Sequence, residues 1–256
     1  MQLVRERRAR FARGSLLAGL TLALALALPL SAAATQDLNP GVLPPGAQAF
    51  GKTYGQWSAV WWQYVFSIPL GSSPFTDDSG ANCGLGQSGP VLFLVGTFTT
   101  TVDPNGVVLA SATRRGCTVP AGKALFFPIF NNECSTLEPP PFHATTPQEF
   151  IDCNRTFIDP VRDLRAEVDG VVIQDLTSYR ARSPIFDFFL PTANNPDGSP
   201  TNILGIPGGG PGKSMADGYY LLLAPLSPGA HIIHFHGFSP PANFAVDVTY
   251  APLTVR

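Results

Sequence analysis

Short apolar runs separated by glycine- and proline-rich segments predict a chain built mainly of β-strands. The runs 91–102 and 107–113 flank an Asp-Pro-Asn-Gly turn at residues 103–106, which predicts a hairpin, and Asp169-Gly170 between two alternating runs predicts another. Three more alternating runs, joined by short turns, follow between residue 216 and the C-terminus. Because no helix alternates with these strands, we predict a mainly β fold: an antiparallel β-sandwich or jelly roll with one or two peripheral helices.

A short apolar run rich in Phe, residues 124–130, lies between the second and third cysteines. Turn residues bound it on both sides, which predicts a strand buried on both faces. By strict alternation Phe126 and Phe130 share one face, and Phe127 lies on the other. Pro128 has no N–H to donate to a ladder, so it indicates a bulge or an edge at that point.

Two helices are predicted beside the strands. In residues 50–69, aromatic side chains recur at steps of four and three, which places them on one helix face. This aromatic stripe consists of Phe50, Tyr54, Trp57, Trp61 and Tyr64. A second helix, near 147–163, has a capping-box start with Thr146 as N-cap, Pro147 at the first position and Glu149 at the third.

The first 34 residues have the order of a secretory signal peptide. Five arginines are followed by the apolar segment Leu16–Leu30 and then by four small residues that end at Ala34. The apolar part is shorter than the roughly 20 residues that a membrane-spanning helix needs, so we expect cleavage and no membrane span in the mature protein. The predicted organisation is a signal peptide (1–34), a flexible lead-in (35–49) and a single β-sandwich domain with an N-terminal aromatic helix (50–256).

Charge and composition restrict the partners of this exported chain. The formal net charge is −2, and removal of five Arg and one Glu with the signal peptide takes it to −6. No basic patch survives, which argues against nucleic acid and anionic membrane surfaces. The expected location is secreted or periplasmic, and the expected partner is an extracellular ligand or a component of the cell envelope.

The cysteine count adds a second argument for export. The four cysteines are Cys83, Cys117, Cys134 and Cys153, all in the exported part. An even number in an oxidising compartment predicts two disulfides. Of the three pairings we favour Cys83–Cys117 with Cys134–Cys153, because each closes a local loop and stabilises by roughly 3 kcal/mol in the chain-entropy model.

Four segments together carry a family resemblance. They are GKTYGQWSAVWWQYVFSIP, NCGLGQSGPVLFLVG, CTVPAGKALFFPIFNNECS and DGYYLLLAPLSPGAHIIHFHG. On these segments the chain resembles a group of exported bacterial proteins that has no assigned activity. The resemblance covers nearly all of the mature chain and implies export and a single globular unit. It brings no catalytic residues with it.

The histidines form the first candidate site. His234 and His236 point to the same side of a predicted strand and can supply two imidazoles to Zn or Cu. A third ligand would come from Glu133, at the end of the central strand, or from His143 in the loop beyond it. Paired histidines on a partly exposed strand also simply hydrogen-bond to their neighbours, so metal binding is an alternative function.

Acidic and amide side chains form a second candidate. Asn131, Asn132 and Glu133 follow the central strand, and Asp77 and Asp78 lie in an earlier loop. Paired carboxylates can carry out glycoside hydrolysis, and the same oxygen atoms can hold Ca²⁺, which we favour less than Zn or Cu. Acidic loop residues are, however, most often only solvated.

The tryptophans form a third candidate. Trp57, Trp61 and Trp62 all lie on the predicted N-terminal helix, where they would serve a carbohydrate-binding module as a platform or dock the helix onto the sheet. No convincing catalytic motif accompanies the β pattern. We therefore expect a secreted or periplasmic, non-catalytic binding or structural protein, with a metal-binding protein or metal-dependent enzyme and a carbohydrate-binding module as alternatives.

Overall fold

The computed structural model describes residue 39 and residues 41–256, so the predicted signal peptide lies outside the described residues. The helices are α1 (Tyr54–Ser67) and α2 (Pro147–Ile158), with 3-10 helices η1 (Leu70–Ser72) and η2 (Leu176–Tyr179). The strands are β1 (Val91–Phe93), β2 (Thr100–Val102), β3 (Val108–Arg114), β4 (Thr118–Val119), β5 (Ala124–Ser135), β6 (Arg162–Val168), β7 (Val171–Val172), β8 (Arg180–Arg182), β9 (Phe186–Leu190), β10 (Gly210–Leu223), β11 (Gly229–Ser239) and β12 (Phe244–Val255). In this part of the chain, no helix has the length and apolar character to cross a membrane.

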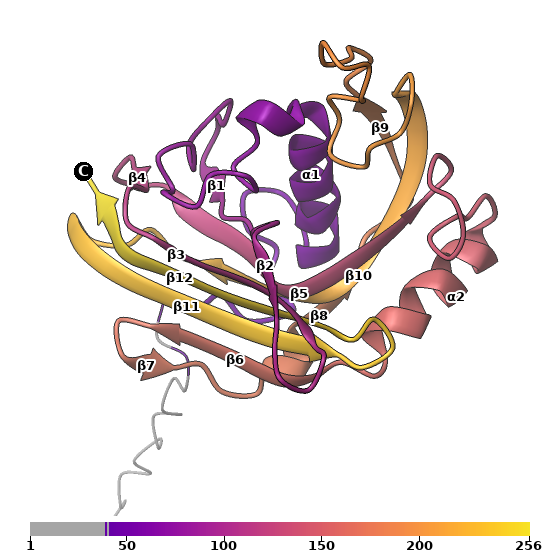
Figure 1. The fold of residues 1–256 in the computed structure, drawn as a ribbon. Helices are drawn as coiled ribbons and strands as arrows, with labels where there is room; N and C mark the ends of the chain where they lie inside the picture. The colour runs from indigo at the N-terminus through magenta and orange to yellow at the C-terminus, as the bar shows by residue number, and fades with distance from the viewer. Residues whose placement is uncertain (1–38, 40) are drawn as a thin grey trace, which may run out of the picture. The chain divides into compact units, whose positions relative to one another are not determined.

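Within the described residues the strands form two sheets, as predicted for a sandwich. Sheet I has five strands in the order β1-β5-β10-β8, with β9 also paired to β10. Sheet II has seven strands in the order β2-β3-β12-β11-β6-β7, with β4 paired to β12. Figure 1 shows α1 on one side of β5 and β10, and the strands of sheet II on the other side.

The purely antiparallel arrangement that we predicted is wrong in part, because both sheets are mixed. Strand β1 runs parallel to β5, and β3 and β4 run parallel to β12. After β1, residues 94–99 cross from sheet I to sheet II instead of returning as a hairpin. The parallel pairs follow from such crossings, since strands that are not joined by a tight turn are free to run in the same direction.

The turn signals in the sequence predicted the hairpin pairs correctly and one pair of neighbouring strands incorrectly. The hairpins β2–β3 and β6–β7 are antiparallel, and β11 pairs antiparallel with β12. Strands β10 and β11, which we expected to pair, lie in different sheets. The short connection between them therefore passes from one layer of the sandwich to the other.

The core has one layer between the two sheets and another between sheet I and α1. Phe127 of β5 contacts Phe235 of β11 across the sandwich, with ring centroids 5.3 Å apart. On the opposite face, Phe126 stacks on Tyr220 of β10 at 5.3 Å and lies 6.0 Å from the ring of Tyr54 on α1. Strand β5 is thus buried on both faces, as its continuous apolar run predicted.

A β-bulge in β5 changes which way its aromatic side chains point. The register against β10 shifts between Tyr220, opposite Pro128, and Tyr219, opposite Phe130. Phe130 consequently faces sheet II, where its ring lies 6.3 Å from that of Phe244. The predicted bulge at Pro128 is confirmed, and the prediction that Phe126 and Phe130 share a face is wrong because the extra residue reverses the alternation.

Both predicted disulfides are present. Cys83 is bonded to Cys117, and Cys134 of β5 is bonded to Cys153 of α2. The α2 helix begins with the expected capping box at Thr146 and ends at Ile158. It is shorter than predicted because Pro160 ends it: proline has no N–H to donate and its ring crowds the preceding turn.

The segment before α1 lies against sheet I. Val42 is buried, and the Leu43 N–H donates to the carbonyl of Leu222 at 2.8 Å. Phe50, which we placed in the helical stripe, precedes α1 in a turn with φ of 52° and is 44% exposed. The helix begins three residues later at the Thr53 cap.

Candidate functional site

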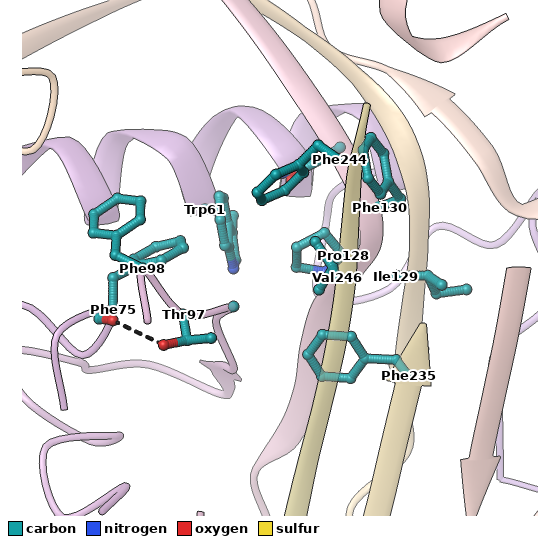
Figure 2. A pocket seen from close by; sticks show the side chains of 12 residues that line it. Trp61, Phe75, Thr97, Phe98, Pro128, Ile129, Phe130, Phe235, Phe244 and Val246 are labelled. Carbon is teal, nitrogen blue, oxygen red and sulfur yellow. Dashed lines mark hydrogen bonds between the residues drawn. The ribbon is translucent and has the colours of Figure 1, made fainter. Parts of the chain in front are cut away.

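An aromatic slot of about 120 Å³ opens where the chain leaves sheet I for sheet II. Figure 2 shows Phe75, Thr97 and Phe98 on one side of it, the side chains from β5, β11 and β12 on the other, and Trp61 between them. The lining residues are Trp61, Phe75, Gly96, Thr97, Phe98, Pro128, Ile129, Phe130, Asn131, Phe235, Phe244 and Val246.

The slot exists because β1 ends early. Strand β1 pairs with β5 only as far as Phe93 opposite Phe126, and the last contact is the Leu94 N–H donating to the Phe126 carbonyl at 3.0 Å. Beyond that point, residues 94–99 bend away and leave the edge of β5 uncovered at Pro128. The indole N–H of Trp61 donates to the Leu94 carbonyl at 2.9 Å, which ties α1 to the start of this segment.

A buried arginine holds the departing segment in place. Arg114 is 1% exposed, and its guanidinium makes five hydrogen bonds. The acceptors are the carbonyls of Pro74 (2.8 Å), Asp77 (3.1 Å), Val95 (2.8 Å) and Gly96 (2.7 Å) and the hydroxyl of Tyr250 (2.7 Å). Because arginine has five N–H donors in a fixed fork, one side chain fixes both loops that form this wall of the slot.

Asp78 fixes the same wall from outside. Its carboxylate accepts from the hydroxyl of Thr97 at 2.7 Å and from that of Thr99. These bonds, that of Thr99 first, hold the pKa of Asp78 below its usual value, with a further contribution from the Arg114 charge. Phe98, 46% exposed, stacks on Phe75 at a centroid distance of 4.8 Å at the rim.

The opposite wall combines sheet I and sheet II. The β5 bulge turns Phe130 toward Phe244, and Gly237 of β11 makes room for it. A Cβ on Gly237 would lie 2.9 Å from the Cβ of Phe130, closer than packed carbon atoms approach. A glycine in a strand is thus explained by close approach of another element. With Phe235 and Val246, these side chains make this wall apolar.

Three polar atoms without partners lie where α1 packs against β5 and β10. The amide nitrogen of Asn131, the indole nitrogen of Trp62 and the hydroxyl of Tyr220 are buried and have no hydrogen-bond partner among the described residues. Tyr220 is fully buried, and its burial raises the pKa of the hydroxyl. Asn131 also lines the slot, so this cluster adjoins the apolar cavity.

A pair of carboxyl groups lies farther along β5. Glu133 is 5% exposed, and one of its carboxyl oxygens accepts from the hydroxyl of Ser214 at 2.5 Å. Burial, and then the adjacent carboxyl of Glu138, raise the pKa of Glu133 well above its usual value. Burial also raises the pKa of Glu138, which accepts from the Ser135 hydroxyl at 2.9 Å. Each of the two buried carboxyl groups therefore holds its proton to a higher pH than a free glutamate does.

The structure does not bring the four predicted metal ligands together. His234 and His236 do share a face, on the outside of sheet II, where both contact Asp247 of β12, at 2.8 and 3.8 Å. Glu133 is in sheet I, and Nδ1 of His143 contacts the Glu138 carbonyl at 2.8 Å. Among the described residues, no three or more His, Cys, Asp or Glu side chains form a group that could hold a metal ion.

The other acids and amides also have structural partners. Asp77 accepts from the backbone N–H groups of Ser79 (3.0 Å) and Asn82 (2.6 Å) in its own loop. Asn132 donates to the side-chain oxygen of Asn154 on α2 at 3.1 Å. The loop acids thus do not face Glu133 in the way that a paired-carboxylate or Ca²⁺ site requires.

The three tryptophans have different surroundings. Trp57 is 6% exposed and donates to the Ala49 carbonyl at 2.9 Å, and Trp61 is 1% exposed. Neither ring forms a surface platform for sugars, because α1 docks its aromatic face onto the protein. Of the candidate residues that we named from the sequence, Trp61 and Asn131 line the slot, and Trp62 belongs with Asn131 to the polar cluster beside it.

Most of the slot could not be found from the sequence. We interpreted 91–102 as one strand, which placed Phe98 on a sheet. Gly96, in the middle of that run, was the available signal that the chain departs, since glycine weakens a strand interior. Arg114 gave no signal, because an arginine at the end of a strand is normally exposed.

Comparisons with protein-family models, with curated proteins and with solved structures find no match to this chain. They therefore do not test the resemblance to exported bacterial proteins, which stays a prediction. The slot itself is the basis on which a function can be proposed.

Proposed function

We propose that this protein is an exported, non-catalytic binding protein that takes a small apolar, single-ring ligand into the aromatic slot. The observation that carries the proposal is the slot: a cavity lined mainly by aromatic and aliphatic side chains and bounded by a wall that Arg114 and Asp78 hold in place. Ligand sites are typically concave, mostly apolar and pre-formed in this way. The two disulfides fit an oxidising compartment.

The size of the slot sets the class of ligand. Its volume of about 120 Å³ is close to that of an engineered apolar cavity, roughly 150 Å³, that binds benzene. Burying a ring of about 150 Å² stabilises by roughly 4 kcal/mol, which corresponds to a dissociation constant near 1 mM. Ethylbenzene, a single ring with a short apolar tail, is a suitable probe.

The test is a calorimetric titration of the protein with ethylbenzene. We expect saturable binding to the wild type and loss of binding in Val246→Phe, because the larger side chain fills the slot from β12. The matched control is Val172→Phe on β7, where the side chain is 55% exposed and lies outside the slot. The control should bind as the wild type does. Equal binding by wild type and Val246→Phe, or no binding by the wild type, would overturn the proposal.

A further inference from the structure

Three buried hydrogen-bond donors converge beside the slot. The Tyr220 hydroxyl faces the side chains of Asn131, Ser58 and Trp62. The hydroxyl of Ser58 already donates to the Gly55 carbonyl at 2.9 Å. The Tyr220 hydroxyl, the Asn131 amide nitrogen and the Trp62 indole nitrogen have no partner among the described residues. We call Asn131, Tyr220 and Trp62 the donor cluster.

The protein leaves the donors of this cluster unused. An indole supplies one N–H, an amide two and a phenol one, and none of the three donor atoms has a hydrogen-bond partner among the described residues. Buried polar groups are normally paired, and a fully buried hydroxyl without a partner calls for an explanation. An acceptor oxygen supplied from outside the chain would pair with these donors.

The charges around the cluster favour a neutral acceptor. Arg114, the buried cation of the slot wall, uses all five of its donors on the protein, so it has none for an anion. Glu133 lies two residues beyond Asn131 on the same face of β5, and its carboxyl is buried. A ligand carboxylate would therefore enter a dry site without a cation and with an acidic neighbour.

We propose that the slot selects ring-bearing molecules with a neutral carbonyl oxygen, which the donor cluster receives while the slot holds the ring. Asn131 is the link, because it belongs to both the slot lining and the donor cluster. The proposal rests on the proposed function and names the ligand class for the same site.

The test compares two probes that differ in one group. Acetophenone carries a carbonyl where ethylbenzene carries a CH₂, and both are titrated calorimetrically into wild type and Tyr220→Phe. We expect the wild type to bind acetophenone about tenfold more tightly than ethylbenzene, and this ratio to fall to about threefold or less in Tyr220→Phe. Benzoate, titrated in parallel, should bind more weakly than acetophenone.

Stability measurements separate binding from folding in this experiment. Because the Tyr220 hydroxyl has no partner among the described residues, Tyr220→Phe should leave the urea midpoint of unfolding unchanged. The matched control is Tyr54→Phe, whose hydroxyl donates to the Leu43 carbonyl at 2.6 Å and accepts from the Leu222 N–H at 3.2 Å, so its loss should lower the midpoint.

The outcomes distinguish the two proposals. If ethylbenzene binds and acetophenone binds no more tightly, the donor cluster is satisfied by water and the carbonyl proposal is wrong, while the slot proposal stands. The carbonyl proposal also fails if the ratio is unchanged in Tyr220→Phe, or if benzoate is the tightest ligand. If neither neutral probe binds, the slot proposal itself fails.

Discussion

Replacement of Arg114 by methionine should both destabilise the protein and open the slot wall. Methionine keeps much of the side-chain volume but removes the five hydrogen bonds of the guanidinium. Four backbone carbonyls lose that donor. Of these, the Val95 carbonyl retains a bond from the Tyr250 hydroxyl at 3.0 Å, and the Asp77 carbonyl retains one from the Gly80 N–H at 3.3 Å. The other two, of Pro74 and Gly96, are left buried or must move toward water.

The magnitude follows from the charge and burial of the lost group. A hydrogen bond to a charged group stabilises by about 1.5–3 kcal/mol, and five such bonds on one side chain do not add. Removing one partner from a buried charged arrangement typically costs about 3–5 kcal/mol. We therefore expect Arg114→Met to lower the free energy of unfolding by about 4 kcal/mol, a large part of the stability of a typical domain.

The assay is urea unfolding, with ethylbenzene titration of the still-folded variant. The matched control is Arg115→Met: the neighbouring arginine is exposed and donates to the Ala251 carbonyl at 3.1 Å, so its loss should change stability by less than about 0.5 kcal/mol. A loss below about 1 kcal/mol for Arg114→Met, or unchanged ethylbenzene binding in that variant, would refute the view that this side chain builds the wall.

Three further predictions concern the acid pair, the second disulfide and a histidine. The folded-state pKa of Glu133 is raised, so its contribution to stability is present below its ordinary value of 4.5 and is lost as pH rises through the folded pKa. Glu133→Gln should therefore gain stability relative to wild type as pH rises above about 4.5 in urea unfolding, and parallel pH curves would contradict this. Replacing Cys134 and Cys153 by serine opens a loop of 19 residues and should lower the unfolding free energy by about 3 kcal/mol; an unchanged urea midpoint would speak against it. Asp169 raises the pKa of His231 above 6.5, so His231→Gln should destabilise more at about pH 5.5 than at about pH 9, and a constant difference would rule this out.

Local signals in the sequence predicted local structure. The Asp-Pro-Asn-Gly and Asp-Gly turns produce hairpins, Thr146 caps α2, and Pro128 marks the β5 bulge. Each of these depends on a backbone preference of a few residues, which the sequence displays directly. The disulfide pairing was also predicted correctly, from the short loops that the two bonds close. Two cysteines that are near in sequence can meet without a particular global fold.

Long-range features were not predictable from such signals. The pairing of β10 with β5, and of β12 with β3, depends on which apolar faces are left to bury after the local pairs have formed. The slot depends on the same long-range pairing, since its walls come from α1, the 94–99 segment, β5, β11 and β12. No sequence pattern around Phe98 or Phe244 places the two side chains together. They line the same slot only because residues 94–99 cross from sheet I to sheet II.

The most direct measurement is a crystal structure of the mature protein grown with ethylbenzene. We predict electron density for one ring in the slot, in contact with Phe98 and Trp61 on one side and with Phe130 and Phe235 on the other, while the 94–99 segment stays in place. Density for ethylbenzene at another site with the slot empty, or a slot filled by the side chain of Phe98, would contradict it.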